Sequence, residues 1–181
     1  MSRIAIPTAD QTPVASLPLL DAVNKQLGIV PNLMKMVGNS PAALEGYLSL
    51  NGAVGKGVLP VGMREKLALA TAQFNGCDYC LSAHSYIGTH MAKLSAGEID
   101  QARDFHSTDA KTNAALHFAK RVLAERGHVG DGDLAAIRAA GFDDAGIVEI
   151  VSNVALNVLT NYLNNVAATD IDFPPVLAHR A

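Results

Sequence analysis

The sequence predicts an all-α fold on three observations. Apolar residues recur at the three- and four-residue spacing of helices, and no segment shows the alternation of a half-buried strand. Serine or aspartate precedes several of these segments and glycine follows most of them, as at the two ends of helices. The segment 145–168 is apolar on nearly every side, which is typical of a helix that is central or shared with another subunit.

Start and stop signals divide the N-terminal half. Proline and small polar residues dominate the first 17 residues, so we expect an extended arm there. Pro18 suits a first helical turn, Gly28 a stop, and Ser40 an N-cap before Pro41. Residues 29–33 predict a turn. The elements expected in the chain are an arm at 1–17, helices at about 18–27, 41–54, 63–74, 77–93, 95–103, 108–127, 131–141 and 145–168, and a tail at 169–181.

The C-terminal half carries its own signals. Ser95 and Glu98 match a capping box, in which each side chain bonds to the backbone of the other residue. Asp131 or Asp133 is expected to cap the next helix, which closes at Gly141. No composition break suggests a second domain, so residues 18–168 are expected to form one helical domain.

Composition excludes several classes of protein. A chain of 181 residues buries a sizeable core, and a net charge of −3 gives no footprint for nucleic acid. We find no signal peptide and no apolar run of about 20 residues, so we expect a cytoplasmic protein that does not enter a membrane. The chain is 49% hydrophobic and only 17% charged, which favours a homo-oligomer.

The chemistry of the chain concentrates between residues 77 and 84. Both cysteines, Cys77 and Cys80, lie here, and His84 follows four residues after the second. At ~100° per residue, Cys80 and His84 fall within about 60° of Cys77 on a helix, so all three share one face. Residues three apart on a helix have Cα atoms roughly 5 Å apart, within the range that a disulfide needs.

This arrangement suits redox chemistry. A cysteine at the first turn of a helix is favoured as thiolate by the free N–H groups there, which points to Cys77. His84 lies one turn beyond Cys80 and can exchange a proton with it. A thiolate attacks a peroxide to become a sulfenic acid, which a second cysteine converts to a disulfide.

A glutamate twelve residues before Cys77 extends the motif to Glu65-x11-Cys77-x2-Cys80-x3-His84. With the surrounding helix 64–68 and the break at Gly76, the pattern resembles the alkylhydroperoxidase D (AhpD)-like and carboxymuconolactone decarboxylase-like family, in particular its peroxidase-related members. The resemblance covers about residues 40–105 tightly and the remaining helices more loosely. The stretch Ile29-Val-Pro-Asn-Leu33 also looks like the start of such chains.

The resemblance implies a self-associating all-α domain, commonly a trimer or hexamer, that reduces organic hydroperoxides or hydrogen peroxide. It implies that Cys80 attacks the peroxide, that Cys77 resolves the intermediate, and that Glu65 and His84 relay protons. An external dithiol reduces the resulting disulfide, and neither a cofactor nor a metal is expected. Tyr79 departs from the pattern, because better-studied members carry histidine there. Tyrosine does not shuttle protons at neutral pH, which bears on the rate rather than the reaction type.

Other interpretations stay open. The same thiols suit a redox sensor or a partner-binding switch, and the same scaffold suits a decarboxylase, although decarboxylase-type members typically lack the CxxC. The cysteines also suit a packed core. A zinc site lacks a fourth ligand at standard spacing, and ~10.5 Å of helix rise separates Cys77 from His84. A c-type haem needs histidine where Leu81 stands, and a thioredoxin fold needs strands around the motif.

Two residue sets remain to be placed. Four further histidines share no spacing with the motif and are expected at the surface or at helix ends: His90, His106, His117 and His128. The last helix holds many asparagines, and we expect some of them to satisfy polar groups near the site or between subunits: Asn153, Asn157, Asn161, Asn164 and Asn165.

Overall fold

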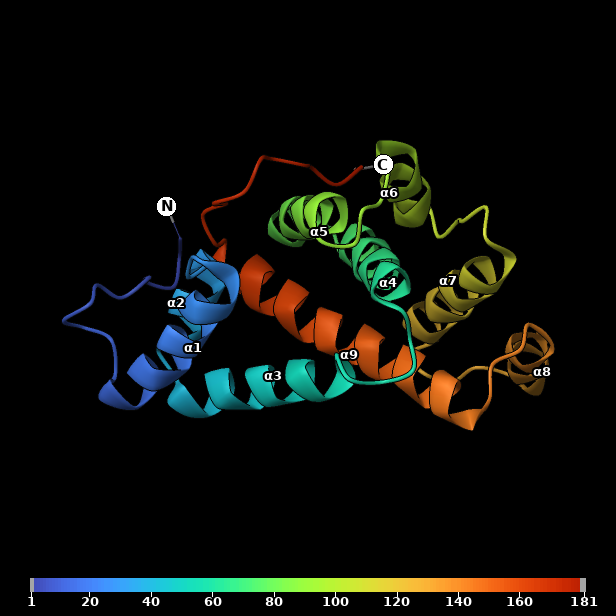
Figure 1. Cartoon of the computed structure of the whole chain (residues 1–181), viewed down its shortest axis with the longest axis horizontal. Helices are drawn as coiled ribbons and strands as arrows, with labels where there is room; N and C mark the ends of the chain where they lie inside the picture. The colour runs from blue at the N-terminus through green and yellow to red at the C-terminus, as the bar shows by residue number, and fades with distance from the viewer. Residues whose placement is uncertain (1, 180–181) are drawn as a thin grey trace.

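The structure is a computed structural model that describes residues 2–179, and the regular elements within this range are all helices (Figure 1). The all-α prediction is therefore confirmed. In chain order the elements are η1 (Val14–Ser16), α1 (Leu17–Leu27), α2 (Asn32–Val37), α3 (Pro41–Val54), α4 (Val61–Phe74), α5 (Asp78–His90), α6 (Ala96–Arg103), α7 (Ala110–Ala124), α8 (Asp131–Ala139) and α9 (Asp144–Ala167).

Capping interactions fix most of the predicted helix starts. The Ser40 side chain accepts a hydrogen bond from the N–H of Ala43 at the start of α3. Ser95 and Glu98 form the predicted capping box of α6, since each side chain accepts a hydrogen bond from the backbone N–H of the other. The N-terminal N–H groups of these helices thus find the partners that the sequence supplies.

Several helix boundaries differ from the prediction, and three of the differences have a clear structural description. Residues 32–37 form a helix, α2, rather than a turn and a short segment. Helix α5 ends at His90, not at about Lys93, because the chain turns there with Lys93 at φ 58° and carries Leu94 back into the core. Gly130, not an aspartate, is the N-cap of α8, and Asp133 accepts a hydrogen bond from its backbone N–H.

Helix α4 is the hub of the domain. It packs against α5, α6, α7 and α9, while α9 also contacts α3 and α7 and runs diagonally across the middle of the molecule (Figure 1). One hydrophobic cluster surrounds the two cysteines and draws on α2, α3, α4 and α5. A second cluster joins α4, α7, α8 and the first half of α9. Glu65 and the cysteines therefore sit on two helices that pack directly together.

The two terminal segments pack onto the helices. In the arm, the backbone N–H of Arg3 donates to the carbonyl of Ala167, and Ser2 bonds to Asp170. In the tail, Ser82 of α5 accepts a hydrogen bond from the N–H of Val176, and Arg103 of α6 donates to the carbonyl of Leu177. The tail thereby lies along α5 and α6 and covers one side of the helix that carries the cysteines.

Helix α9 is long and apolar enough to cross a membrane by length and composition alone. Half of the window that meets this criterion is buried inside the domain, and the central helix of a folded domain gives the same signal.

Candidate active site

The N-terminus of α5 positions both cysteines. Gly76 adopts the left-handed conformation, φ 62°, and turns the chain out of α4 so that Cys77 becomes the N-cap of α5. The Cys77 Sγ accepts a hydrogen bond from the N–H of Cys80, at 3.3 Å. Both thiols are buried and free, with Cys77 0% and Cys80 2% exposed. The predicted pair thus lies within one helical turn.

Glu65 and His84 meet across the packing of α4 against α5. The Nδ1 atom of His84 lies 2.8 Å from Oε2 of Glu65, and the two side chains are 22% and 15% exposed. Because a carboxylate only accepts hydrogen bonds, this contact holds a proton on Nδ1 of His84. The other nitrogen, Nε2, is then free to take a proton. The structure therefore brings together all four residues that the sequence singled out.

Two further helices contribute residues that the motif did not include. The Nδ2 atom of Asn164, in α9, donates to the Sγ of Cys80 at 3.2 Å. Asn161 lies one turn earlier and is fully buried. Tyr47, in α3, also lies near the site. Burial, followed by the negative charges of Cys80 and Glu65, raises the pKa of its hydroxyl. Its position in an apolar stripe gave no sequence signal for a place at the site.

The environment of Cys80 favours its thiolate. Burial alone raises the pKa of a thiol, but here the Cys77 thiol, His84, Asn164 and Asn161 outweigh it and lower the pKa of Cys80 to about 7. A substantial fraction of Cys80 is therefore ionised at neutral pH, which makes it the nucleophile of the pair.

Cys77 behaves in the opposite way. Its hydrogen bond with Cys80 has the largest effect, and together with burial and the negative charge of Cys80 it raises the pKa of Cys77. The backbone N–H of Cys80 acts in the other direction and is outweighed. The expectation that the helix start favours the Cys77 thiolate is thus wrong, because one buried site does not hold two adjacent anions.

His84 gains basicity from its partner. Burial lowers the pKa of an imidazole, yet the charge and the hydrogen bond of Glu65, followed by the charge of Cys80, raise the pKa of His84. An imidazolium at this position stabilises the Cys80 thiolate, so the two groups favour each other's charged forms.

Tyr79, which stands where the resemblance expects histidine, holds other elements together. Its hydroxyl donates to Oδ1 of Asp172 at 2.8 Å and accepts from the N–H of Leu33 at 3.1 Å. Its ring packs edge-on against Phe173, with centroids 5.9 Å apart. Tyr79 therefore links the start of α2 to the C-terminal tail, and its hydroxyl is occupied by these two bonds.

The four histidines expected at the surface or at helix ends are exposed: His90, His106, His117 and His128. Over residues 2–179, no three His, Cys, Asp or Glu side chains lie close enough together to hold a metal ion. Cys77, Cys80 and His84 thus lack the shared centre that the zinc interpretation requires.

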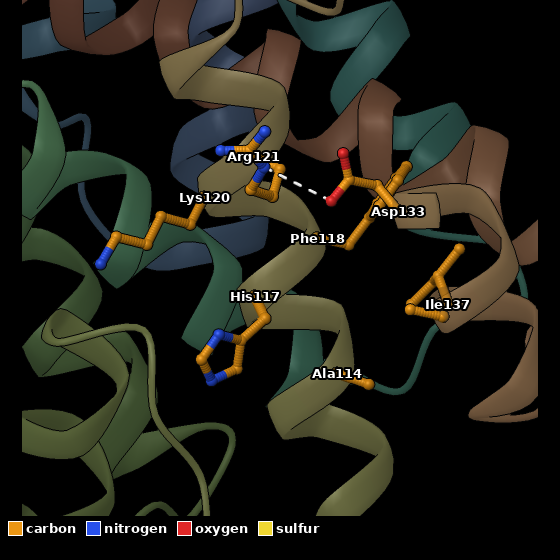
Figure 2. A pocket seen from close by; sticks show the side chains of 8 residues that line it. Ala114, His117, Phe118, Lys120, Arg121, Asp133 and Ile137 are labelled. Atoms are coloured by element: carbon orange, nitrogen blue, oxygen red, sulfur yellow. Dashed lines mark ion pairs between the residues drawn. The ribbon is translucent and has the colours of Figure 1, made fainter. Parts of the chain in front are cut away.

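A cavity of about 290 Å³ lies between α7 and α8, away from the cysteines (Figure 2). Figure 2 shows Arg121 of α7 and Asp133 of α8 at its rim, joined by an ion pair of 3.4 Å. Phe118 and Ile137 form part of its wall and belong to the second hydrophobic cluster, whereas the cysteines belong to the first. This cavity is not part of the thiol site.

Comparison with known proteins identifies the fold. Residues 41–125 match the model of the carboxymuconolactone decarboxylase family. A peroxidase-related protein from Ralstonia eutropha JMP134, described as an alkylhydroperoxidase AhpD core, superposes with a TM-score of 0.85 and 26% identity over 94% of this chain and 92% of that one. Part of the sequence and the whole fold thus resemble the AhpD/carboxymuconolactone decarboxylase-like family. These comparisons confirm the resemblance seen in the sequence.

Two further solved structures share the fold. A peroxidase-related protein from Silicibacter sp. TM1040 gives a TM-score of 0.81 at 22% identity, covering 97% of this chain and 92% of that one. The debrominase Bmp8 gives 0.77 at 20% identity, covering 93% and 91%. A comparison with curated proteins yields no match. The AhpD-like family therefore indicates an enzyme with a peroxidase-related or decarboxylase-like function.

Proposed function

We propose that this AhpD-like protein is a thiol peroxidase that reduces organic hydroperoxides or hydrogen peroxide through Cys80 and Cys77. The observation that carries the proposal is the Glu65–His84 pair, 2.8 Å apart, beside a buried cysteine whose pKa is lowered to about 7. A carboxylate-oriented base next to an ionised thiol is the arrangement that thiol nucleophiles require. The resolving thiol already lies three residues away on the same helix.

The first step is nucleophilic attack. The proton of the Cys80 thiol passes to Nε2 of His84, while Glu65 stabilises the imidazolium through Nδ1. The thiolate attacks the terminal oxygen of the hydroperoxide, so that an S–O bond forms as the O–O bond breaks. The departing alkoxide takes the proton from His84 and leaves as an alcohol. Sulfur is oxidised, the peroxide is reduced, and Cys80 becomes a sulfenic acid.

The second half of the cycle restores the thiols. Cys77 attacks the sulfur of the Cys80 sulfenic acid, forming a disulfide and releasing water. Its raised pKa keeps it a thiol until then, which preserves the division of roles between the two cysteines. An external dithiol then reduces the disulfide through a mixed disulfide and is itself oxidised.

Access to Cys80 favours small substrates. The sulfur is almost fully buried, whereas His84 and Glu65 are partly exposed, so a peroxide approaches past the imidazole. This route brings the leaving oxygen close to the group that protonates it. Bmp8 shares only the fold at its identity to this chain, so we keep hydroperoxides as the proposed substrate class.

The test is consumption of cumene hydroperoxide with excess dithiothreitol. We expect Cys80→Ser and Cys77→Ser to abolish turnover and Glu65→Gln to slow it by about 100-fold or more, the contribution typical of general acid–base catalysis. Glu45→Gln, at an exposed glutamate of α3 outside the site, is the matched control and should turn over like the parent protein. Full activity of Cys80→Ser would overturn the assignment.

The redox-sensor interpretation predicts a different result in the same samples. A switch would form the Cys77–Cys80 disulfide and change its assembly or partner binding without catalytic turnover. Size-exclusion chromatography of the reduced and oxidised protein, run beside the peroxide assay, separates the two proposals. A decarboxylase would instead be insensitive to Cys77→Ser and Cys80→Ser.

A further inference from the structure

Helix α9 carries four buried asparagines on its inner face: Asn153, Asn157, Asn161 and Asn164. A buried amide requires hydrogen-bond partners, and the first two find them within α9. The Nδ2 of Asn153 donates to the carbonyl of Glu149 at 2.7 Å, and that of Asn157 to the carbonyl of Asn153 at 2.8 Å. Asn161 and Asn164 instead reach across to the thiol site.

Asn164 is bound to the reacting atom itself. Its Nδ2 donates to the Sγ of Cys80 at 3.2 Å, and both residues are only 2% exposed. Sulfur is a weak acceptor as a thiol and a much stronger one as a thiolate, so this contact gains strength when Cys80 ionises.

Asn161 presents a donor that lies close enough to Cys80 to lower its pKa but makes no hydrogen bond with the described residues of the resting site. The Nδ2 of Asn75 donates to its Oδ1 at 2.9 Å, which orients the amide and leaves its Nδ2 as the free end. Within residues 2–179 this buried Nδ2 has no hydrogen-bond partner. Asn161 precedes Asn164 by three residues and so shares its face of α9. An orphaned buried donor at a reactive site marks a place where an acceptor arrives during the reaction.

We propose that Asn161 and Asn164 form an anion-holding pair for Cys80: Asn164 binds the thiolate, and the Nδ2 of Asn161 binds the oxygen that Cys80 gains. We call the binding of the thiolate by Asn164 the thiolate half of the proposal and the binding of the oxygen by Asn161 the oxygen half. The oxygen half rests on the proposed peroxidase function. When the S–O bond forms and the alkoxide leaves, the new sulfenic oxygen needs a donor, and Asn161 supplies it. The pair thereby holds negative charge before the attack and the polar product after it.

The charges around Cys80 are consistent with this role. The titratable groups around it are Cys77 at the start of α5, Tyr79 and His84 within α5, Tyr47 from α3 and, behind His84, Glu65 from α4. Burial opposes ionisation of Cys80, and Cys77, His84, Asn164 and Asn161 act together to lower its pKa. The amides do so without titrating themselves, so their effect persists at every pH.

The thiolate half is tested by alkylation. In a Cys77→Ser background, the rate of reaction with iodoacetamide as a function of pH reports the ionisation of Cys80 alone. We expect Asn164→Ala to raise the midpoint, so that alkylation at pH 6 slows by about tenfold or more. Asn164→Asp, which keeps the volume and adds a charge, should raise the midpoint further. Asn165→Ala changes the next residue, which is exposed and donates to the Asn75 carbonyl, and should leave it unchanged.

An unchanged midpoint in both Asn164 variants, with a native circular dichroism spectrum, would overturn the thiolate half. This assay uses no peroxide, so its result does not depend on the proposed function. The oxygen half is tested in the same background by trapping the sulfenic acid with dimedone after addition of cumene hydroperoxide.

We expect Asn161→Ala to reduce the dimedone adduct severalfold relative to Asn165→Ala. Equal adduct in the two variants would overturn the role of Asn161. No adduct in any variant, including the parent, would overturn the peroxidase cycle and the oxygen half together, and the alkylation midpoints would still decide the thiolate half.

Discussion

At the scale of single residues, the ionisation of Cys80 should set how the proposed peroxidase reaction depends on pH. Its pKa is lowered to about 7, so the thiolate forms as the pH rises through neutrality. We expect kcat/KM for cumene hydroperoxide to fall about tenfold for each unit of pH below 7 and to level off above it. His84→Gln removes a charge that lowers this pKa and should move the midpoint upward. A midpoint at the ordinary thiol value of about 8.5 in the parent protein would contradict this.

Tyr79 is expected to contribute to stability rather than to chemistry. Its hydroxyl accepts a hydrogen bond from the N–H of Leu33 and donates one to the carboxylate of Asp172. Tyr79→Phe removes the partner of both groups and should lower the free energy of unfolding by about 1 to 3 kcal/mol. Urea denaturation measures this loss. Tyr86→Phe is the control, because Tyr86 also packs against Phe173 but its ring is 43% exposed. A slower peroxide reaction at unchanged stability would instead give Tyr79 a place in the relay.

Local spacing predicted part of the site and missed the rest for a physical reason. Cys77, Cys80 and His84 share a helix, so their common face followed from the period of 3.6 residues. The role of Glu65 was predicted from the family pattern alone. Without that pattern, a glutamate between Arg64 and Lys66 is expected on a solvent-exposed face. Asn164 reaches Cys80 from 84 residues away, and no spacing rule connects two helices that only tertiary packing brings together.

At the scale of the elements, a polar contact joins α4 to α6. Lys66, 7% exposed, lies 2.9 Å from Glu98, whose side chain also accepts the backbone N–H of Ser95. The Ser95 backbone, the Lys66 contact and the Ser95 hydroxyl lower the pKa of Glu98 to about 2. The stabilisation is therefore complete above the unfolded value near 4.5 and disappears as the pH falls toward 2.

Glu98→Gln tests this contribution. The variant leaves Lys66 buried without a charged partner and weakens the capping box, so its melting temperature should be below that of the parent at pH 7. The difference should shrink between about pH 4.5 and pH 2 as Glu98 of the parent protonates. A difference that stays constant across this interval would show that the charge of Glu98 contributes nothing.

Helix ends divide into those that the sequence determines and those that packing determines. Ser40 and Ser95 cap through bonds within four residues, so local sequence predicted α3 and α6 correctly. The end of α5 depends instead on the burial of Leu94. Its side chain packs beside Gly88 of α5, in the hydrophobic cluster that also holds Ile99 of α6. This contact forms only once α5 and α6 have packed, so the local sequence predicted residues 91–93 as a continuation of the helix.

At the scale of the whole molecule, α9 has two faces with different tasks. Its inner face holds the asparagines that meet Cys80, and its outer face exposes an apolar stripe at helical spacing: Val148, Val151, Ala155, Leu159, Tyr162 and Val166. Val148, Tyr162 and Val166 are 63%, 58% and 65% exposed. The near-encircling apolar pattern that the sequence shows in this helix thus divides between the core and the surface.

This stripe leads to a prediction about assembly. A continuous apolar face along a 24-residue helix favours burial against another subunit, and we propose the homo-oligomer expected from composition, a trimer or hexamer by family resemblance, with α9 at the contact. Leu159→Lys combined with Val166→Lys places two charges in the stripe and should shift the mass measured by light scattering toward the monomer. Leu27→Lys, at an apolar residue of α1 that is 41% exposed, should leave the mass unchanged. A parent protein that remains a monomer over a 100-fold range of concentration would contradict the prediction.

The same double variant tests whether assembly supports the thiol site. If it does, dissociation should also raise the pH midpoint of the reaction of Cys80 with iodoacetamide, because α9 carries both the stripe and the two asparagines.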